Sequence, residues 1–302
     1  MALGLDFVQP GGAYDSFLWE IARHGGRAVL LVQRLQQPRV DSNAPGPVSG
    51  VTAPVEEVMM TARRAQRLGL TVGIMPIVTL EQLAPGQWRG TLQPPDVQAW
   101  FETYSSIVVG LATQAEAVGV ELLVVGSELG SLEYRGDLWR QLESRVRRVF
   151  SGTVTYSMNW DRIGPDSHQE VFDVVGISGY FEVDEQEATV NGWRQRWEHI
   201  GQELEEVSQE AGAPVVLVEY GYRSHPDAWR RPWDHGSAEP VDLAAQAQLL
   251  AVALSAMERL EVVSSAYLWN WFGHGGRDDA SFSPRNKPAA WVLAEHCRTK
   301  DG

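Results

Sequence analysis

Cysteine, long apolar runs and metal-binding motifs are all scarce in this sequence. A single cysteine, Cys297, excludes an internal disulfide and a cysteine-rich zinc site. The seven histidines show neither HxH nor HExxH spacing, so we expect no metal and no other cofactor. No stretch approaches the roughly 18 uncharged apolar residues of a membrane helix, and we expect no membrane partner.

Positive charge is also in short supply. The chain has 25 basic against 39 acidic residues, a formal net charge of −14. Nucleic-acid binding depends on concentrated Lys and Arg, so we expect no nucleic-acid partner. The opening MALGLDFVQP lacks a basic segment, an apolar run and a small-residue cleavage site, and is interpreted as a first strand. We expect a monomer that is cytoplasmic, or secreted if a leader has been removed.

Apolar segments of strand length alternate with amphipathic segments of helix length. Strands are expected at 3–9, 27–34, 71–78, 120–127, 153–159, 173–180, 214–219 and 263–271. Helices are expected at about 14–25, 54–69, 95–119, 135–149, 191–212, 242–260 and 287–298, and the link between strands five and six is too short for one. Near-continuous Val, Ile and Leu indicates strands buried on both faces. The pattern predicts an α/β protein, a (β/α)8 TIM barrel that forms a single domain over residues 1–302.

The alternative architecture is a doubly wound open sheet. Such a sheet normally carries a Gly-rich phosphate loop after its first strand. Here the segment QPGGAY follows, with neither GxGxxG nor GxxxxGK[ST], so a nucleotide site has little support. The segment 36–53 is rich in Pro, Gly and Ser, and we expect a rim loop because the barrel pattern continues beyond it.

Two of the expected strands end in a glutamate. The segments ELLVVGSELG and APVVLVEYGY place Glu128 and Glu219 at the carboxyl ends of strands four and seven, where barrel active sites lie. A salt bridge with a rim arginine explains either residue alone equally well. The pair is more specific, because strands four and seven face each other across a barrel. Glycoside hydrolysis needs one protonated and one ionised carboxyl flanking the same bond.

Glutamates on strands four and seven are the hallmark of clan A glycoside hydrolases. Four motifs resemble glycoside hydrolase family 113, whose known members are β-mannanases: VVGSEL at 124–129, VVGISGYF at 174–181, VLVEYGYRS at 216–224 and YLWNWFGHGGRDDASFSPRNKPA at 267–289. The order of strands and helices resembles that family over most of the chain. It implies that Glu128 is the general acid/base and Glu219 the nucleophile. Clan members commonly carry Asn before the acid/base, whereas Ser127 here agrees with the family 113 motif, so another residue must contact the sugar 2-hydroxyl.

Further residues near the strand ends complete the predicted site. The resemblance implies that Tyr180 donates a hydrogen bond to the nucleophile. Asn159 is a candidate sugar contact, with turn capping as the alternative interpretation. Trp269 and Trp271 alternate along strand eight, which predicts that both rings share a face, with Trp269 beneath the sugar being cleaved. Trp160 is expected to serve a neighbouring subsite.

Other charged residues near these strand ends receive structural interpretations. Arg34 could hold Glu219 ionised from strand two, although we expect a solvated rim arginine there. We expect loop-shaping roles for Asp278 and Asp279, and a solvated acidic surface at 182–187. Because the general acid must be protonated while the nucleophile is ionised, we expect the carboxyl pair to titrate as a unit, with the raised pKa on the acid/base.

The favoured hypothesis is a retaining, endo-acting hydrolase that cleaves β-1,4-mannosidic linkages in mannan-like polysaccharides. The same residues acting on another β-glycan, such as an exopolysaccharide or a cell-wall polymer, form the first alternative. A carbohydrate-binding barrel without catalysis is the second, and the presence of both glutamates weakens it. Because a barrel supports many chemistries, the hypothesis depends on the site residues and not on the fold.

Overall fold

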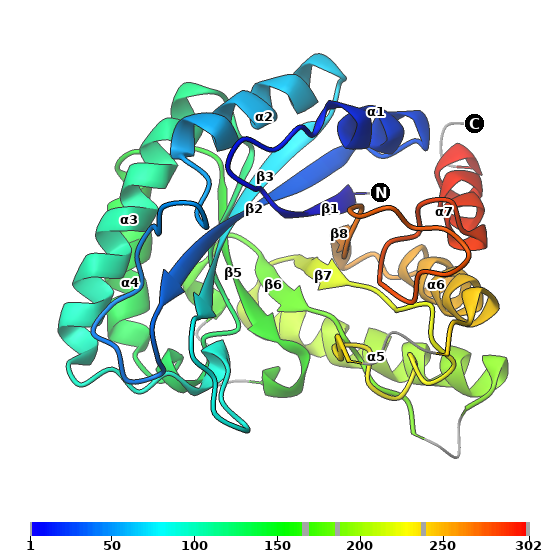
Figure 1. Cartoon of the computed structure of the whole chain (residues 1–302). Helices are drawn as coiled ribbons and strands as arrows, with labels where there is room; N and C mark the ends of the chain where they lie inside the picture. The colour runs from blue at the N-terminus through cyan, green and yellow to red at the C-terminus, as the bar shows by residue number, and fades with distance from the viewer. Residues whose placement is uncertain (1, 165–168, 185–187, 237–239, 300–302) are drawn as a thin grey trace.

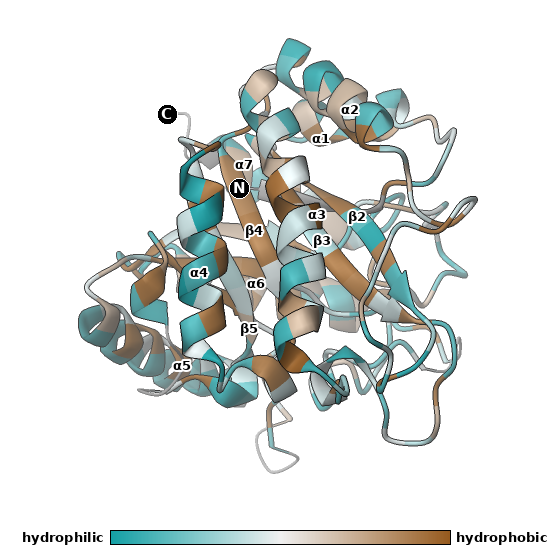
Figure 2. Ribbon diagram, turned by 90° about the vertical axis from the view of Figure 1, so that its left-hand side faces the viewer, coloured by the Kyte–Doolittle hydropathy of each residue, from teal (hydrophilic) through white to brown (hydrophobic). Residues whose placement is uncertain are grey.

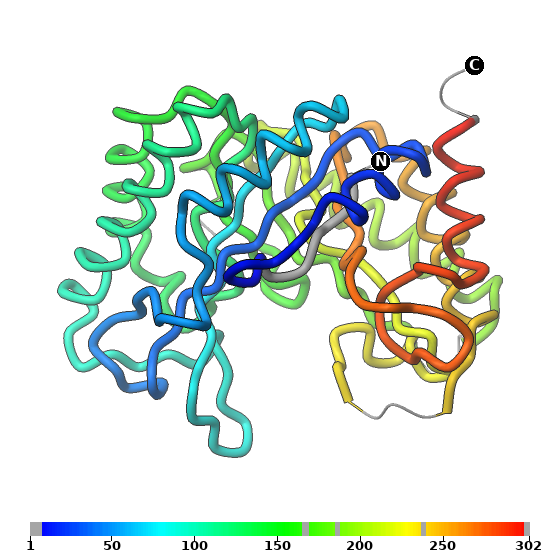
Figure 3. The backbone as a smooth tube through the Cα atoms, turned by 45° about the horizontal axis from the view of Figure 1, so that its top comes forward, coloured from blue at the N-terminus to red at the C-terminus, as the bar shows by residue number. Residues whose placement is uncertain are grey.

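The computed structural model describes residues 2–164, 169–184, 188–236 and 240–299. Eight parallel strands close into a barrel in chain order. They are β1 (Ala2–Phe7), β2 (Ala28–Gln37), β3 (Thr71–Leu80), β4 (Leu122–Ser127), β5 (Thr153–Asn159), β6 (Val175–Ser178), β7 (Val215–Tyr220) and β8 (Val263–Leu268). Pairing of β1 with β8 closes the barrel and brings the two ends of the chain to the same side (Figure 3).

Among the described residues, seven α-helices surround the barrel (Figure 1). They are α1 (Asp15–Arg23), α2 (Val55–Arg67), α3 (Val97–Ala117), α4 (Gly136–Arg147), α5 (Val190–Ala211), α6 (Leu243–Met257) and α7 (Pro288–Thr299). Two short 3-10 helices, η3 (Trp160–Arg162) and η4 (Gln169–Val171), lie between β5 and β6, where the short link predicted no full helix. The predicted (β/α)8 barrel is confirmed, with β8 shorter than expected because it ends at Leu268.

The barrel wall separates two apolar layers. Along β2, Leu30 and Val32 belong to a cluster inside the barrel, whereas Val29 and Leu31 belong to the layer between strands and helices. This alternation follows from the period of two in a strand, and burial of both faces accounts for the near-continuous apolar runs. Figure 2 shows brown strands behind α3 and α4; the outer face of α4 is largely teal, and that of α3 is pale with some teal.

Side-chain caps define where several helices begin. The carboxylates of Asp96 and Asp242 and the hydroxyl of Thr189 accept hydrogen bonds from backbone N–H groups in the first turns of α3, α6 and α5. Such caps satisfy donors that the helix itself cannot pair. Within the described residues, the helices include none that combines the length and apolar character of a membrane span.

Long loops extend from the carboxyl ends of the strands. The loop 81–96 contains the 3-10 helix η1 (Arg89–Thr91), and the loop 221–242 joins β7 to α6. Both project at the same end of the barrel (Figure 3). The segment after β2 folds back on itself, where Gln36 and Gly46 form an isolated antiparallel bridge, so the predicted rim loop is present.

Candidate active site

A cleft of about 1170 Å³ opens at the carboxyl ends of the strands and contains both predicted carboxylates. It exceeds the roughly 300–1,000 Å³ of typical small-molecule sites. Its aromatic lining comprises Trp88, Trp160, Tyr180, Trp233, Trp269, Phe272 and Phe282. A second hollow of about 1200 Å³ lies between α1 and α7, but a single carboxylate, that of Glu20, is among its lining residues. The paired carboxylates single out the first cleft.

Glu219 is the penultimate residue of β7 and is almost completely buried. The phenolic Oη of Tyr180 donates a hydrogen bond to its Oε2 at 2.9 Å. The hydroxyl of Ser127, the last residue of β4, donates to its Oε1 at 3.4 Å. These two contacts fix the orientation of the carboxylate, and the tyrosine bond lies where the family resemblance implied it.

Glu128 directly follows β4 and also lies almost completely out of solvent. Its backbone N–H donates to the carbonyl of Ser157 at 2.8 Å, and its φ angle is +55°. A left-handed backbone costs an ordinary L-residue about 1–2 kcal/mol. Its Oε2 forms an ion pair with Nη2 of Arg89, which comes from η1 in the loop 81–96.

The two carboxylates and the arginine form one electrostatic unit. Burial, and next the negative charge of Glu128, raise the pKa of Glu219 to about 7, against the lowering effects of Arg89, Tyr180 and Ser127. Burial opposes the charge on Arg89, but the two carboxylates raise the pKa of its guanidinium. Burial also raises the pKa of Tyr180, which keeps its hydroxyl proton for donation. Glu219 therefore titrates near neutral pH and is mostly protonated below it.

The raised pKa lies on a different carboxyl from the one the sequence predicted. We expected it on the general acid, whereas the structure raises the pKa of Glu219. The physical reasons are the burial of Glu219 and the negative charge of Glu128 beside it.

Aromatic rings lie close to the carboxylate pair. Trp269 lines the cleft and belongs to the apolar cluster inside the barrel. Trp160 on η3 stacks on Trp233, with ring centroids 5.6 Å apart and an angle of 27° between the planes. Asn159 accepts a hydrogen bond from the N–H of Trp160 at 3.0 Å and also lines the cleft. Its observed contact is thus the turn cap that was weighed as the alternative.

Comparison with known proteins identifies the family. A model of Glycoside Hydrolase Family 113 matches residues 15–283. The chain belongs to this family of glycoside hydrolases. The family 113 hydrolase is similar to the structure of a family 113 β-mannanase, AaManA from Alicyclobacillus acidocaldarius, with a TM-score of 0.87 and 24% identity over 99% of this chain and 96% of that one. No match was found among curated proteins.

Two further solved structures share the barrel fold with the family 113 hydrolase. A family 113 β-1,4-mannanase in a complex has a TM-score of 0.85 and 22% identity, over 99% of this chain and 98% of that one. A GH5_18 protein from Streptomyces cattleya, in complex with Manβ1-4GlcNAc, has a TM-score of 0.66 and 14% identity over 99% and 80%. The similarity therefore extends along the whole barrel.

Trp271 lies outside the cleft of the family 113 hydrolase, contrary to the expectation that it shares a face with Trp269. Its indole N–H donates to Glu20 at 3.0 Å, and its ring lies 5.0 Å from that of His24. It belongs to the layer between strands and helices and borders the hollow between α1 and α7. The prediction was wrong because β8 ends at Leu268, and the period-two rule holds only within a strand.

Several residues that line the cleft of the hydrolase were missed from the sequence. Arg89 and Trp88 belong to the loop 81–96, and Trp233 and His235 to the loop 221–242. Arg34 borders the cleft, and so does the exposed Glu182 from the acidic segment 182–187. Glu185 and Glu187 of that segment lie outside the described residues. Among the described residues, no three His, Cys, Asp or Glu side chains are arranged to hold a metal ion.

Proposed function

We propose that this hydrolase is a retaining endo-β-1,4-mannanase that cleaves mannan-like polysaccharides. The observation that carries the proposal is the buried pair of Glu128 and Glu219 in one aromatic cleft, with Tyr180 and Arg89 as their polar partners. Two structurally similar family 113 proteins are named as a β-mannanase and a β-1,4-mannanase. The volume of the cleft supports binding of more than one sugar ring, and hence cleavage within a chain.

The proposed reaction has two displacement steps. The carboxylate of Glu219 attacks the anomeric carbon, while Glu128 gives its proton to the glycosidic oxygen that leaves. Glu128 then takes a proton from water, whose oxygen displaces Glu219 and releases a sugar of unchanged anomeric configuration. The hydrogen bonds from Tyr180 and Ser127 orient the nucleophile throughout.

The proton must reside on Glu128 when the glycan is bound. Before the glycan binds, the raised pKa of Glu219 instead favours a proton on the nucleophile. A glycosidic oxygen placed beside Glu128 accepts a hydrogen bond only from the protonated acid, so substrate binding favours the productive state.

The decisive experiment replaces Glu219 with Ala and adds azide. Turnover of an aryl β-mannoside should be abolished, and azide should restore some of it by forming a glycosyl azide of inverted configuration. Glu205→Ala, at an exposed position on α5, is the matched control and should keep wild-type activity. Near-normal activity of Glu219→Ala, or an inverted first product of the wild-type enzyme by NMR, would contradict the proposed mechanism.

A panel of glycans tests the substrate. Reducing-sugar release should be greatest with β-1,4-mannan and should appear first as oligosaccharides of mixed length. Preferential action on a glucan, xylan or chitosan would favour the other β-glycan hypothesis. Binding without turnover of any member would favour the non-catalytic barrel.

We also propose that the enzyme acts as a monomer, without nucleic acid, in the cytoplasm or after secretion. Light scattering coupled to gel filtration should give the mass of one chain. Fractionation of the cells that produce the protein, with hydrolase activity measured in the cytoplasmic and secreted fractions, distinguishes the two locations.

A further inference from the structure

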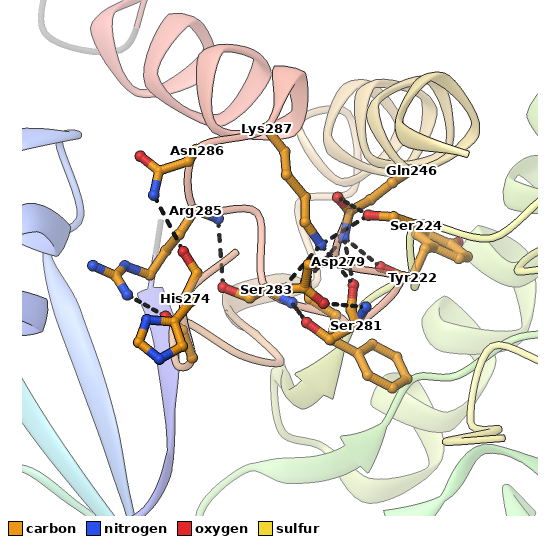
Figure 4. Close-up of polar contacts among 12 residues, drawn as sticks. Tyr222, Ser224, Gln246, His274, Asp279, Ser281, Ser283, Arg285, Asn286 and Lys287 are labelled. Atoms are coloured by element: carbon orange, nitrogen blue, oxygen red, sulfur yellow. Dashed lines mark hydrogen bonds and ion pairs between the residues drawn. The ribbon is translucent and has the colours of Figure 1, made fainter. Parts of the chain in front are cut away.

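The segment 269–287 joins β8 to α7 and brings Ser281 and Phe282 to the cleft. Lys287, at the end of this segment, has a completely buried side chain. Its ammonium donates hydrogen bonds to the hydroxyl of Ser224 at 2.9 Å and to the carbonyl of Ser281 at 3.0 Å, and it lies 3.7 Å from a carboxylate oxygen of Asp279 (Figure 4). The lysine thus ties the segment to the loop after β7.

Gln246 on α6 makes a second connection between the same two segments. Its side chain is fully buried, and its Nε2 donates to the carbonyls of Tyr222 at 2.9 Å and Phe282 at 3.0 Å. Its Oε1 accepts from the hydroxyl of Ser224 at 2.8 Å (Figure 4). We refer to Lys287, Gln246 and Ser224 as the clamp.

The clamp is connected to the nucleophile by two short routes. Tyr222 and Ser224 follow Glu219 by three and five residues, so the clamp fixes the chain where it leaves β7. On the other side, the ring of Phe282 packs edge-on against that of Tyr180, with centroids 6.1 Å apart. Tyr180 in turn donates its hydrogen bond to Glu219.

A buried ammonium is a costly way to fill space. An apolar side chain would occupy the same volume without the loss of hydration, and replacing buried ionic groups by apolar ones is often neutral or stabilising. Burial lowers the pKa of Lys287 to about 8, against the raising effect of Asp279, so the side chain is still mostly charged at pH 7. Its bonds to two separate loops are specific in direction, which an apolar residue cannot reproduce.

We propose that Lys287 and Gln246 are positioning residues, which hold Phe282 against Tyr180 and thereby keep the hydrogen bond from Tyr180 on Glu219. The inference rests on the proposed function, because it assigns the clamp to the nucleophile of that reaction. Neither residue lines the cleft, so their effect is exerted through other side chains.

The test compares Lys287→Met, Gln246→Glu and Ser224→Ala with Gln248→Glu, a matched control at an exposed position on the same helix. In Gln246→Glu, the amide donor is replaced by a carboxylate that faces carbonyl oxygens. For a soluble mannooligosaccharide, kcat should fall about tenfold or more in the first two variants, with KM nearly unchanged, because misplaced catalytic groups slow the reacting step. Ser224→Ala removes only one hydroxyl and should show a smaller loss in kcat.

Two additional measurements separate positioning from loss of stability. The basic limb of kcat/KM reports loss of the last proton of the carboxyl pair, and it therefore follows the raised pKa of Glu219. Because the Tyr180 bond lowers that pKa, the limb should move to higher pH in Lys287→Met and Gln246→Glu. Hydrogen exchange of the backbone at 279–284 should become faster in both variants, but not in Gln248→Glu. If Lys287→Met does not fold, Ser224→Ala and Gln246→Glu decide the question.

The outcomes distinguish the two proposals. A wild-type enzyme inactive on every mannan would contradict the proposed function, and unchanged exchange at 279–284 would still overturn the clamp. With an active wild type, clamp variants that keep kcat and the pH profile overturn the inference, even when their melting temperature falls. A slower kcat with a displaced basic limb supports it.

Discussion

Replacing Glu219 with Gln should stabilise the folded enzyme at alkaline pH but not in acid. The pKa of Glu219 is raised from 4.5 to about 7 in the folded state, so folding favours the protonated form. The stability gained from that proton is fully present below pH 4.5 and is lost as the pH rises through about 7. The displacement corresponds to about 3 kcal/mol in the free energy of unfolding.

Chemical denaturation at several pH values measures this effect directly. The unfolding free energies of wild type and Glu219→Gln should agree near pH 4.5 and diverge with increasing pH, until the variant is more stable by about 3 kcal/mol above pH 8. Glu205→Gln, an exposed control on α5, should follow the wild type throughout. The electrostatic reasoning is refuted if Glu219→Gln shows no gain at pH 8.5, or if the full gain is already present at pH 4.5.

Three further predictions concern catalysis. Glu128→Gln should slow hydrolysis of mannan far more than that of an aryl β-mannoside with a good leaving group, and similar losses on both substrates would contradict its role as acid. Arg89→Met should move the basic limb of kcat/KM to higher pH by about one unit or more, since a cation that lowers the pKa of Glu219 is lost. Arg64→Met, on α2, is the control. An unmoved limb in Arg89→Met would exclude Arg89 from the electrostatic unit. Exhaustive dialysis against EDTA should leave activity intact, so a loss that one divalent ion restores would show that a metal takes part.

The carboxylate pair could be predicted because it lies at the ends of regular strands. Glu128 and Glu219 each end an otherwise apolar run, and in a parallel barrel the ends of all strands meet at one rim. Their position was therefore fixed by the same pattern that predicted the fold. Trp269 follows β8 directly and reaches the cleft for the same reason.

Residues outside regular elements could not be placed in this way. Arg89 lies in a loop of irregular backbone, and no periodicity relates such a residue to the strand ends. Trp271 was misplaced because the pattern does not reveal that β8 stops at Leu268. Lys287 was part of a recognised motif, yet Gln246 lies 41 positions earlier, on α6, and only the folded chain brings the two together.

The left-handed backbone at Glu128 places a conformational cost on the residue that is proposed as the catalytic acid. Glycine adopts a φ of +55° without the steric penalty that a glutamate incurs, so the rules of the backbone alone would select glycine there. Glycine at 128 would relieve this backbone cost, but it would also remove the carboxylate that pairs with Arg89. The residue proposed as the catalytic acid thus stands at a position that backbone preference alone would give to glycine.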